Sequence, residues 1–249
     1  MLKVLLIATL CWPLMTWAQT GAHERTLIAA ADPYPPYVDP QAPGEGLAME
    51  IVRAAYKTQG YTVKLEIMPW VRAEKGVSEG RYDILVDVWR TEARAKELLF
   101  STAYATSKIK FIKRKDNSFE FTGLDSLAGK RIGVIRGYGY NDAFNAATTF
   151  TREEVPSMEH NINKVLLKRL DLTLEDEITA KVLIRKMGPK VEEQLDFTAN
   201  ALASNPLYVA AGLKHPRHKA IVEAFNRGLL AIKADGSFLA IEKRYGLVK

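Results

Sequence analysis

The strongest constraint on the fold is an alternation between short apolar runs and amphipathic stretches. Residues 27–31, 61–68 and 82–88 have the character of strands, and each is followed by a segment with helical spacing of its apolar residues. Strands that alternate with helices favour a parallel sheet covered by crossover helices. A second α/β pattern follows the polar stretch at 114–118, so we expect an α/β protein built from two such units.

The N-terminus resembles a secretory signal. Lys3 supplies the positive start, an apolar core runs to Trp17, and Ala18 precedes a plausible cleavage position at Gln19. The apolar core is shorter than the ~20 residues that span a membrane easily. We therefore expect a cleaved signal peptide over residues 1–18 and a periplasmic protein, with an uncleaved anchor as the alternative. The only cysteine, Cys11, lies in this segment, so the mature chain would have no disulfide.

The charge pattern argues against several classes of partner. The formal net charge is +6, but the basic residues are scattered among acids, without an arginine-rich arm. Zinc-type ligand spacing is also missing, so we expect neither a nucleic acid partner nor a metal. The dinucleotide-binding fingerprint requires a third glycine after those at 137 and 139, and this chain does not have it. We therefore expect no cofactor. We expect all four histidines to be solvated: His23, His160, His215 and His218.

One arginine lies where a helix start would normally have an acid. Thr91 is placed to cap a helix, and a capping box would put Glu or Gln at position 94, where this chain has Arg94. A cation in the first turn opposes the helix dipole, so something should compensate it. An anionic ligand bound by the guanidinium is one explanation. A surface arginine paired with Glu92 or Glu97 is the other.

Other candidate ligand contacts lie where strands end. Tyr34 is on a proline-stiffened loop after the first strand, and open α/β sheets bind ligands at such ends. Loop packing is the alternative for Tyr34, and it is the better explanation for Tyr37 on the same loop. Trp70 begins a helix directly after a strand and either stacks on a ligand or covers the core. Glu175 and Asp176 follow a later strand, where they act as helix caps or meet a ligand ammonium.

The order and spacing of several motifs resemble a known family. The chain is similar to bacterial extracytoplasmic solute-binding proteins of polar amino-acid ABC transporters, family 3. The resemblance covers essentially the whole mature chain. The similar segments are Asp32-Pro33-Tyr34, Gly80-Arg81-Tyr82-Asp83, Thr91-Glu92-Ala93-Arg94, the run 127–134, Glu175-Asp176-Glu177 and Ala234-Asp235-Gly236-Ser237.

The resemblance implies a type II periplasmic binding protein fold, with two lobes, two hinge strands and a ligand cleft between the lobes. Lobe 1 would comprise residues 25–112 and 208–249, and lobe 2 residues 113–207. It also implies that Arg94 clamps a ligand α-carboxylate, Asp176 takes the α-ammonium and Tyr34 stacks on the ligand. Because Arg94 and Asp176 would lie in opposite lobes, a ligand that contacts both would favour the closed state. The implied partners are a small-molecule ligand and the permease of an ABC transporter, with the binding protein itself a monomer.

This chain departs from the family pattern at the expected pocket. Asp87 and Trp89 stand where relatives usually carry small hydroxyl residues or glycine, and Tyr138 and Gly139 stand where a threonine pair is common. An acid at position 87 would repel a ligand carboxylate unless Arg90 or Arg72 neutralises it. The ligand is therefore either larger, aromatic or cationic, or the pocket is partly closed.

Three functions fit these observations. The leading hypothesis is a non-enzymatic periplasmic protein that captures a small polar, amino-acid-like ligand and delivers it to an ABC permease. The second is an enzyme resembling periplasmic cyclohexadienyl or arogenate dehydratases, with Glu175 or Asp87 as general acid. The third is a ligand-sensing module that signals to a separate receptor.

Overall fold

The computed structural model describes residues 25–247, so the predicted signal peptide at 1–18 lies outside the described residues. The strands are β1 (Arg25–Ala31), β2 (Tyr61–Ile67), β3 (Ile84–Trp89), β4 (Leu98–Phe100), β5 (Ala105–Arg114), β6 (Arg131–Ile135), β7 (Thr151–Val155), β8 (Leu172–Asp176) and β9 (Leu195–Gly212). The α-helices are α1 (Leu47–Thr58), α2 (Trp70–Ser78), α3 (Glu92–Ala95), α4 (Asp142–Ala146), α5 (Met158–Leu166), α6 (Glu177–Met187), α7 (Pro189–Glu192), α8 (His218–Ala234) and α9 (Ser237–Arg244). Two 3₁₀ helices, η1 (Pro43–Glu45) and η2 (Leu124–Leu127), complete the described elements.

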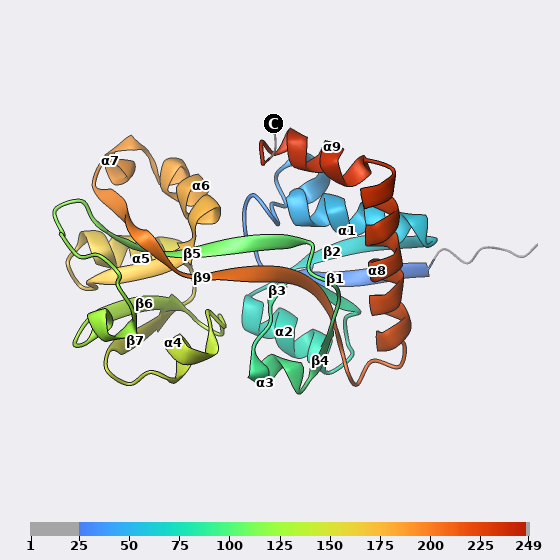
Figure 1. Ribbon diagram of the computed structural model, residues 1–249, viewed down its shortest axis with the longest axis horizontal. Coiled ribbons are helices and arrows are strands. Elements are labelled where there is room, and N and C mark those ends of the chain that lie inside the picture. Colours follow the sequence, from blue (N-terminus) through green and yellow to red (C-terminus); the bar gives the residue numbers. More distant parts are fainter. Residues whose placement is uncertain (1–24, 248–249) are drawn as a thin grey trace, which may run out of the picture.

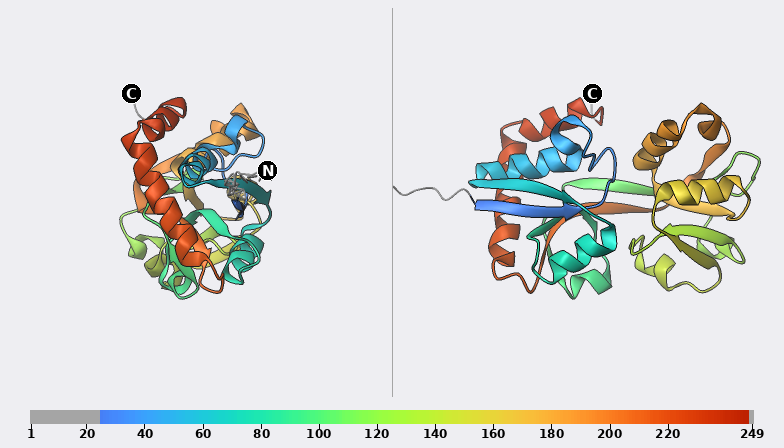
Figure 2. Two further views of the ribbon diagram at one scale, coloured as in Figure 1. Left: turned by 90° about the vertical axis from the view of Figure 1, so that its right-hand side faces the viewer. Right: turned by 180° about the vertical axis from the view of Figure 1, so that it is seen from behind.

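Two lobes are joined by the long antiparallel strands β5 and β9 (Figure 1). The strand order is β2-β1-β3-β9-β5-β8-β6-β7, with β4 also paired to β9. Strand β1 pairs in parallel with β2 and β3, and β6 pairs in parallel with β8, as the strand–helix alternation predicted. Strand β6 also pairs in parallel with β7. Seen from behind, the same two strands connect the lobes (Figure 2). The predicted boundaries near 112 and 207 fall inside these strands and remain predictions.

Lobe 1 buries both faces of its sheet. Side chains of β1 and β3 alternate, so Ile84 and Val86 pack with helices α1 and α8, whereas Leu85 packs with α2 on the opposite face. Helices α1 and α8 approach very closely. A Cβ added to Gly228 of α8 would lie 2.1 Å from the carbonyl oxygen of Ala55 in α1, so only glycine fits at this crossing.

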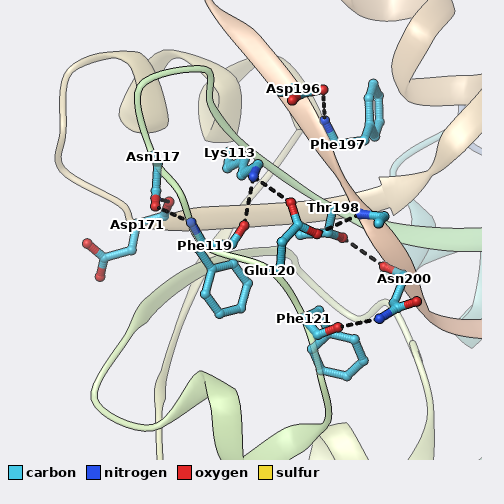
Figure 3. A network of polar contacts seen from close by, with 11 residues as sticks. Lys113, Asn117, Phe119, Glu120, Phe121, Asp171, Asp196, Phe197, Thr198 and Asn200 are labelled. Atoms are coloured by element: carbon cyan, nitrogen blue, oxygen red, sulfur yellow. Dashed lines mark hydrogen bonds and ion pairs between the residues drawn. The ribbon is translucent and has the colours of Figure 1, made fainter.

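The far end of lobe 2 is secured by a polar network between the loop after β5 and strand β9 (Figure 3). The buried Lys113 donates to the Phe119 carbonyl and to Glu120, each at 2.7 Å. Glu120 also accepts from the amide of Ala199, and Asn200 donates to the carbonyl of Phe121 at 2.9 Å. Because every polar atom in these contacts bonds within the lobe, we assign the network a structural role.

Most predicted strands and helices are present, but four features were missed. Strands β4 and β7 and the short helix α7 were not predicted, and β9 begins at Leu195 rather than at Leu207. Most of residues 195–206 are exposed or half-buried. This part of β9 therefore lacks the apolar pattern by which a strand is predicted from sequence. His215 was expected to be solvated but is buried, with Nε2 3.1 Å from Asp83.

Within residues 25–247, no helix is long and apolar enough to cross a membrane.

Candidate functional site

A cavity lies where strands β1, β3 and β6 end beside the start of helix α2. Its volume is about 20 Å³, room for about one water molecule. The lining residues are Asp32, Tyr34, Trp70, Asp87, Trp89, Arg94 and Tyr138. All of the ligand-contacting residues predicted from sequence except Asp176 are among them, and Asp32 is added. Whether they bind a ligand remains a prediction.

Lobe 1 supplies most of the lining through strand ends. Tyr34 follows β1, and Trp89 is the last residue of β3. Between Leu85 and Val88 the β3–β9 register shifts, so β3 contains one extra residue at a β-bulge. Such bulges re-aim side chains at sheet edges and sites. Asp87 lies in this bulge, and its side chain reaches the cavity although every residue of β3 is buried.

Arg94 is buried, with only 6% of its surface exposed, and its guanidinium is extensively bonded. Nε and Nη2 donate to the two carboxylate oxygens of Glu74, each at 3.0 Å. Nη1 donates to the carbonyl of Trp89 at 2.9 Å, and Nη2 also reaches the carbonyl of Gly137 in lobe 2 at 3.0 Å. The guanidinium thus forms a bidentate pair inside lobe 1 and a contact across to lobe 2.

The surface-arginine alternative for Arg94 is wrong, because the residue is buried and its partner is Glu74 in helix α2. Glu92 pairs instead with Arg90, 3.0 Å away, and both side chains are exposed. The predicted cap is confirmed, since Thr91 Oγ1 accepts from the amide of Arg94 at 3.2 Å. The anion expected to compensate the cation is therefore present in the chain itself. An incoming α-carboxylate would compete with Glu74 for the same N–H groups.

Tyr138, from the loop after β6 in lobe 2, extends into the aromatic surroundings provided by lobe 1. Its ring centre lies 5.5 Å from that of Trp89, 6.0 Å from Trp70 and 6.4 Å from Tyr34, each nearly perpendicular. Its hydroxyl donates to Asp32 at 2.9 Å. The ring of one lobe thus fills the aromatic pocket of the other, which explains why the remaining cavity is small.

Two glycines allow the lobes to approach at this point. Gly137 has φ +79°, a left-handed conformation that favours glycine. A Cβ added to Gly139 would lie 2.7 Å from Thr91 Cγ2 and 3.1 Å from Arg94 Nη1. Helix α4 adds a further contact, because Asp142 accepts from the amide of Glu92 at 3.3 Å. The absence of side chains at 137 and 139 therefore lets the two lobes meet over Arg94.

Two acids of the cavity are held in a setting that disfavours their charge. Burial raises the pKa of Asp32 to about 6, against an opposing hydrogen bond from Tyr138. Burial, together with the nearby Asp32, raises the pKa of Asp87 well above its usual range. Arg90 does not neutralise Asp87, because it is exposed and paired with Glu92. The arginine whose charge acts on Asp87 is Arg94, which opposes the rise in the pKa of Asp87. The repulsion predicted for a carboxylate ligand applies where Asp87 is ionised.

Three buried polar atoms around the cavity have no hydrogen-bond partner. They are Oδ1 of Asp87 and the indole Nε1 atoms of Trp70 and Trp89. All three residues line the cavity, and their exposed fractions are 7% or less. Buried polar atoms are rarely left unpaired in folded proteins, and each unpaired group needs an explanation. Two donors and one acceptor of the cavity-lining residues are therefore left without a partner.

Asp176 has a different environment from the one the resemblance implied. It caps helix α6, and its carboxylate accepts from Ile178, Thr179, Ser107 and Lys108 at 2.9–3.0 Å. Both carboxylate oxygens of Asp176 thus accept hydrogen bonds from the protein. This is the helix-cap role that the sequence left open for this acid. Binding of a ligand ammonium by Asp176 stays a prediction. The adjacent Glu175 is buried, and burial raises its pKa well above the usual range.

Sequence reasoning missed Asp32 and Glu74 as parts of the site. Asp32 directly precedes the proline loop at the end of β1, so its position at a strand end was a usable signal. Glu74 carried none, because only the packing of α2 beside α3 brings it to Arg94. Tyr37 behaves as expected of a packing residue: it is buried and stacked on Tyr34, with ring centres 5.4 Å apart.

Residues 27–248 match the family model described as bacterial extracellular solute-binding proteins, family 3. The chain belongs to this family. It is 26% identical to the arginine-binding periplasmic protein of Mannheimia haemolytica, covering 90% of this chain and 92% of that protein. It is also 23% identical to the L-cystine-binding protein TcyJ of Escherichia coli K12, covering 88% and 81% respectively.

Solved structures share the fold of this family 3 protein. A mutant of the T. maritima protein ArgBP superposes with a TM-score of 0.74 at 18% identity, covering 88% of this chain and 94% of that chain. A histidine kinase sensor domain with similarity to periplasmic binding proteins gives a TM-score of 0.78 at 21% identity, covering 89% and 96%. These likenesses confirm the two-lobed periplasmic binding protein fold predicted from the sequence.

Proposed function

We propose that this protein captures a small polar, amino-acid-like solute between its two lobes and delivers it to the permease of an ABC transporter. The observation that carries the proposal is the cavity, which is lined by Trp70, Asp87 and Arg94 of lobe 1 and by Tyr138 of lobe 2. A solute that contacts both lobes favours the closed arrangement, and closure is the form that a permease can distinguish from the open one.

Membership of the solute-binding family supports this proposal over the alternatives. The two relatives described above are named as binding proteins for arginine and for cystine. The dehydratase alternative receives no support from them. The likeness to a histidine kinase sensor domain concerns the fold alone and does not favour sensing. Location in the periplasm as a monomer completes the proposal.

Solute capture is tested by thermal unfolding of the exported protein against acidic, neutral and basic amino acids and their decarboxylated analogues. A solute at a hundred times its Kd should raise the unfolding free energy by about 2.7 kcal/mol. Uptake of that solute by cells should also be lost on deletion of the gene and restored by the intact chain. A protein that binds no member of any charge class would contradict the proposal, as would turnover of the bound compound.

A further inference from the structure

The charges around the cavity do not balance once the hydrogen bonds are assigned. Arg94 is the only cation among the lining residues, and Glu74 pairs with it through both carboxylate oxygens. The remaining carboxyl groups of the lining belong to Asp32 and Asp87. A further acid, Glu175, lies close enough to affect Tyr138 and Tyr34 electrostatically. The cavity therefore has acids to offer a ligand and no unpaired base.

The aromatic residues form the second part of the argument. Tyr34, Trp70 and Trp89 surround the position now filled by the ring of Tyr138. Their faces and edges make a cage of the kind that attracts ammonium and guanidinium groups through cation–π interactions. The guanidinium of Arg94 already lies over Trp70, with its carbon 4.9 Å from the ring centre. A cage of aromatic rings with carboxyls at its base is suited to a positive headgroup.

The unpaired acceptor among the buried polar atoms forms the third part. Asp87 is 7% exposed, and its Oδ1 accepts no hydrogen bond although it borders the cavity. A buried carboxyl that gains a cationic donor becomes stable in its charged form. An anionic ligand would instead add a like charge beside Asp87 and Asp32. It would also have to displace Glu74 from Arg94 before it found a partner.

From these observations we propose that the cleft recognises its solute through an organic cation, an ammonium or guanidinium group held by Asp32 and Asp87 within the cage of Tyr34, Trp70 and Trp89. Arg94 then serves as a structural residue paired with Glu74 and does not bind a ligand carboxylate. This inference rests on the proposed function and narrows it to one solute class. The cation takes the place of the Tyr138 ring, which moves out with the loop after β6, because the present cavity of about 20 Å³ is too small for a solute.

Calorimetric titration of the exported protein with matched probes tests the inference. Agmatine, putrescine and choline carry cations without a carboxylate, L-arginine carries both groups, and L-glutamate has no side-chain cation. We expect at least one carboxylate-free cation to bind within about threefold of L-arginine or more tightly, and L-glutamate to bind about a hundredfold more weakly. Equal binding of cations with and without the carboxylate shows that Arg94 contributes nothing to recognition.

Isosteric variants assign the contacts. Asp87→Asn should weaken binding of the cation about tenfold or more, and Asp32→Asn should do the same, because each removes a counter-charge without changing shape. Neither variant buries a new charge, so both should fold. The matched control is Glu66→Gln, which removes an exposed acid of β2 outside the cavity and should leave the affinity unchanged.

Three results would overturn the inference. One is binding of L-arginine more than about tenfold tighter than agmatine, since the carboxylate would then be recognised. Another is a preference for L-glutamate or a neutral solute; in that case solute capture stands and only the cationic class is wrong. The third is failure of every cationic probe to bind both the native chain and Tyr138→Ala, in which the cage is vacated.

Discussion

Glu74 of helix α2 holds Arg94 with two hydrogen bonds of 3.0 Å, although the residues are 20 positions apart in the chain. The arginine is almost fully buried, whereas the glutamate side chain remains 28% exposed. The pair occupies the guanidinium edge that the family resemblance assigned to a ligand carboxylate. This internal partner is the central difference between the expected site and the observed one.

Removing the charge of Glu74 should destabilise the protein and change its ligand preference. Glu74→Gln leaves the buried guanidinium uncompensated, and we expect a loss of about 1–3 kcal/mol in urea unfolding because the partner is partly exposed. The freed donors of Arg94 should also give the variant new affinity for carboxylate solutes in calorimetry. Glu79→Gln, which removes a surface partner of Arg81, should change stability by less than about 0.5 kcal/mol. Equal stability of the two variants would contradict the assignment.

Truncation of Tyr138 should open the cavity. Tyr138→Ala removes a ring that contacts three aromatic side chains of lobe 1, so we expect a loss of about 2–4 kcal/mol in the absence of solute. Tyr138→Phe keeps the ring and loses only the bond to Asp32, at a cost of about 1 kcal/mol. Chemical denaturation of both variants gives the comparison. If Tyr138→Ala were as stable as the native chain, the ring would not fill the pocket as described.

Stability should decline as pH rises through the range in which Asp32 titrates. The folded state holds this proton up to about pH 6, whereas the unfolded chain releases it near 3.8. As pH rises from about 4 to about 6, the folded state binds more protons than the unfolded chain, so the unfolding free energy falls by up to about 3 kcal/mol. Above about pH 6, Asp32 causes no further change in the unfolding free energy. The groups that interact with Asp32 are Tyr138, Asp87, Glu175 and Arg94.

Asp32→Asn isolates this contribution, since Asn does not titrate and still accepts from Tyr138. The difference in unfolding free energy between the native chain and the variant, measured from pH 3.5 to 7.5, should change in favour of the variant as pH rises. Asp87 and Glu175, whose pKa values are also raised, continue the decline in both proteins; because the charge of Asp32 contributes to both shifts, their part of the decline is smaller in the variant and adds to the difference. A difference that does not vary with pH would show that Asp32 titrates normally.

A side chain at position 139 should separate the lobes. In Gly139→Ala the new Cβ would clash with Thr91 Cγ2 at 2.7 Å, so we expect the closed arrangement to be replaced by a more open one. Small-angle scattering would detect this as an increased radius of gyration. Adding Thr91→Ser removes the clashing methyl group but keeps the hydroxyl that caps helix α3. The double variant keeps the contact with Arg94 Nη1 at 3.1 Å and should therefore be more closed than Gly139→Ala but less closed than the native chain. Unchanged scattering in Gly139→Ala would argue against lobe contact here.

Several parts of this protein were determined by local sequence alone. The apolar runs and the helix periodicity predicted strands β1, β2, β3, β6 and β8 with the helices between them. Thr91 predicted the start of helix α3, because its hydroxyl accepts a hydrogen bond from the backbone amide three residues later. The motif order predicted the two-lobed fold and nearly all of the cavity lining.

Tertiary structure decided which side chains far apart in the sequence contact each other. Glu74 reaches Arg94 only because α2 and α3 lie side by side. Tyr138 reaches Asp32, 106 positions away in the chain, only because the two lobes meet. Burial then set the ionisation of Asp32 and Asp87, which depends on the low-polarity surroundings assembled by both lobes. Local patterns specify strands and caps because those interactions span a few residues. The charge of a binding site depends on which side chains the folded chain brings together and removes from water.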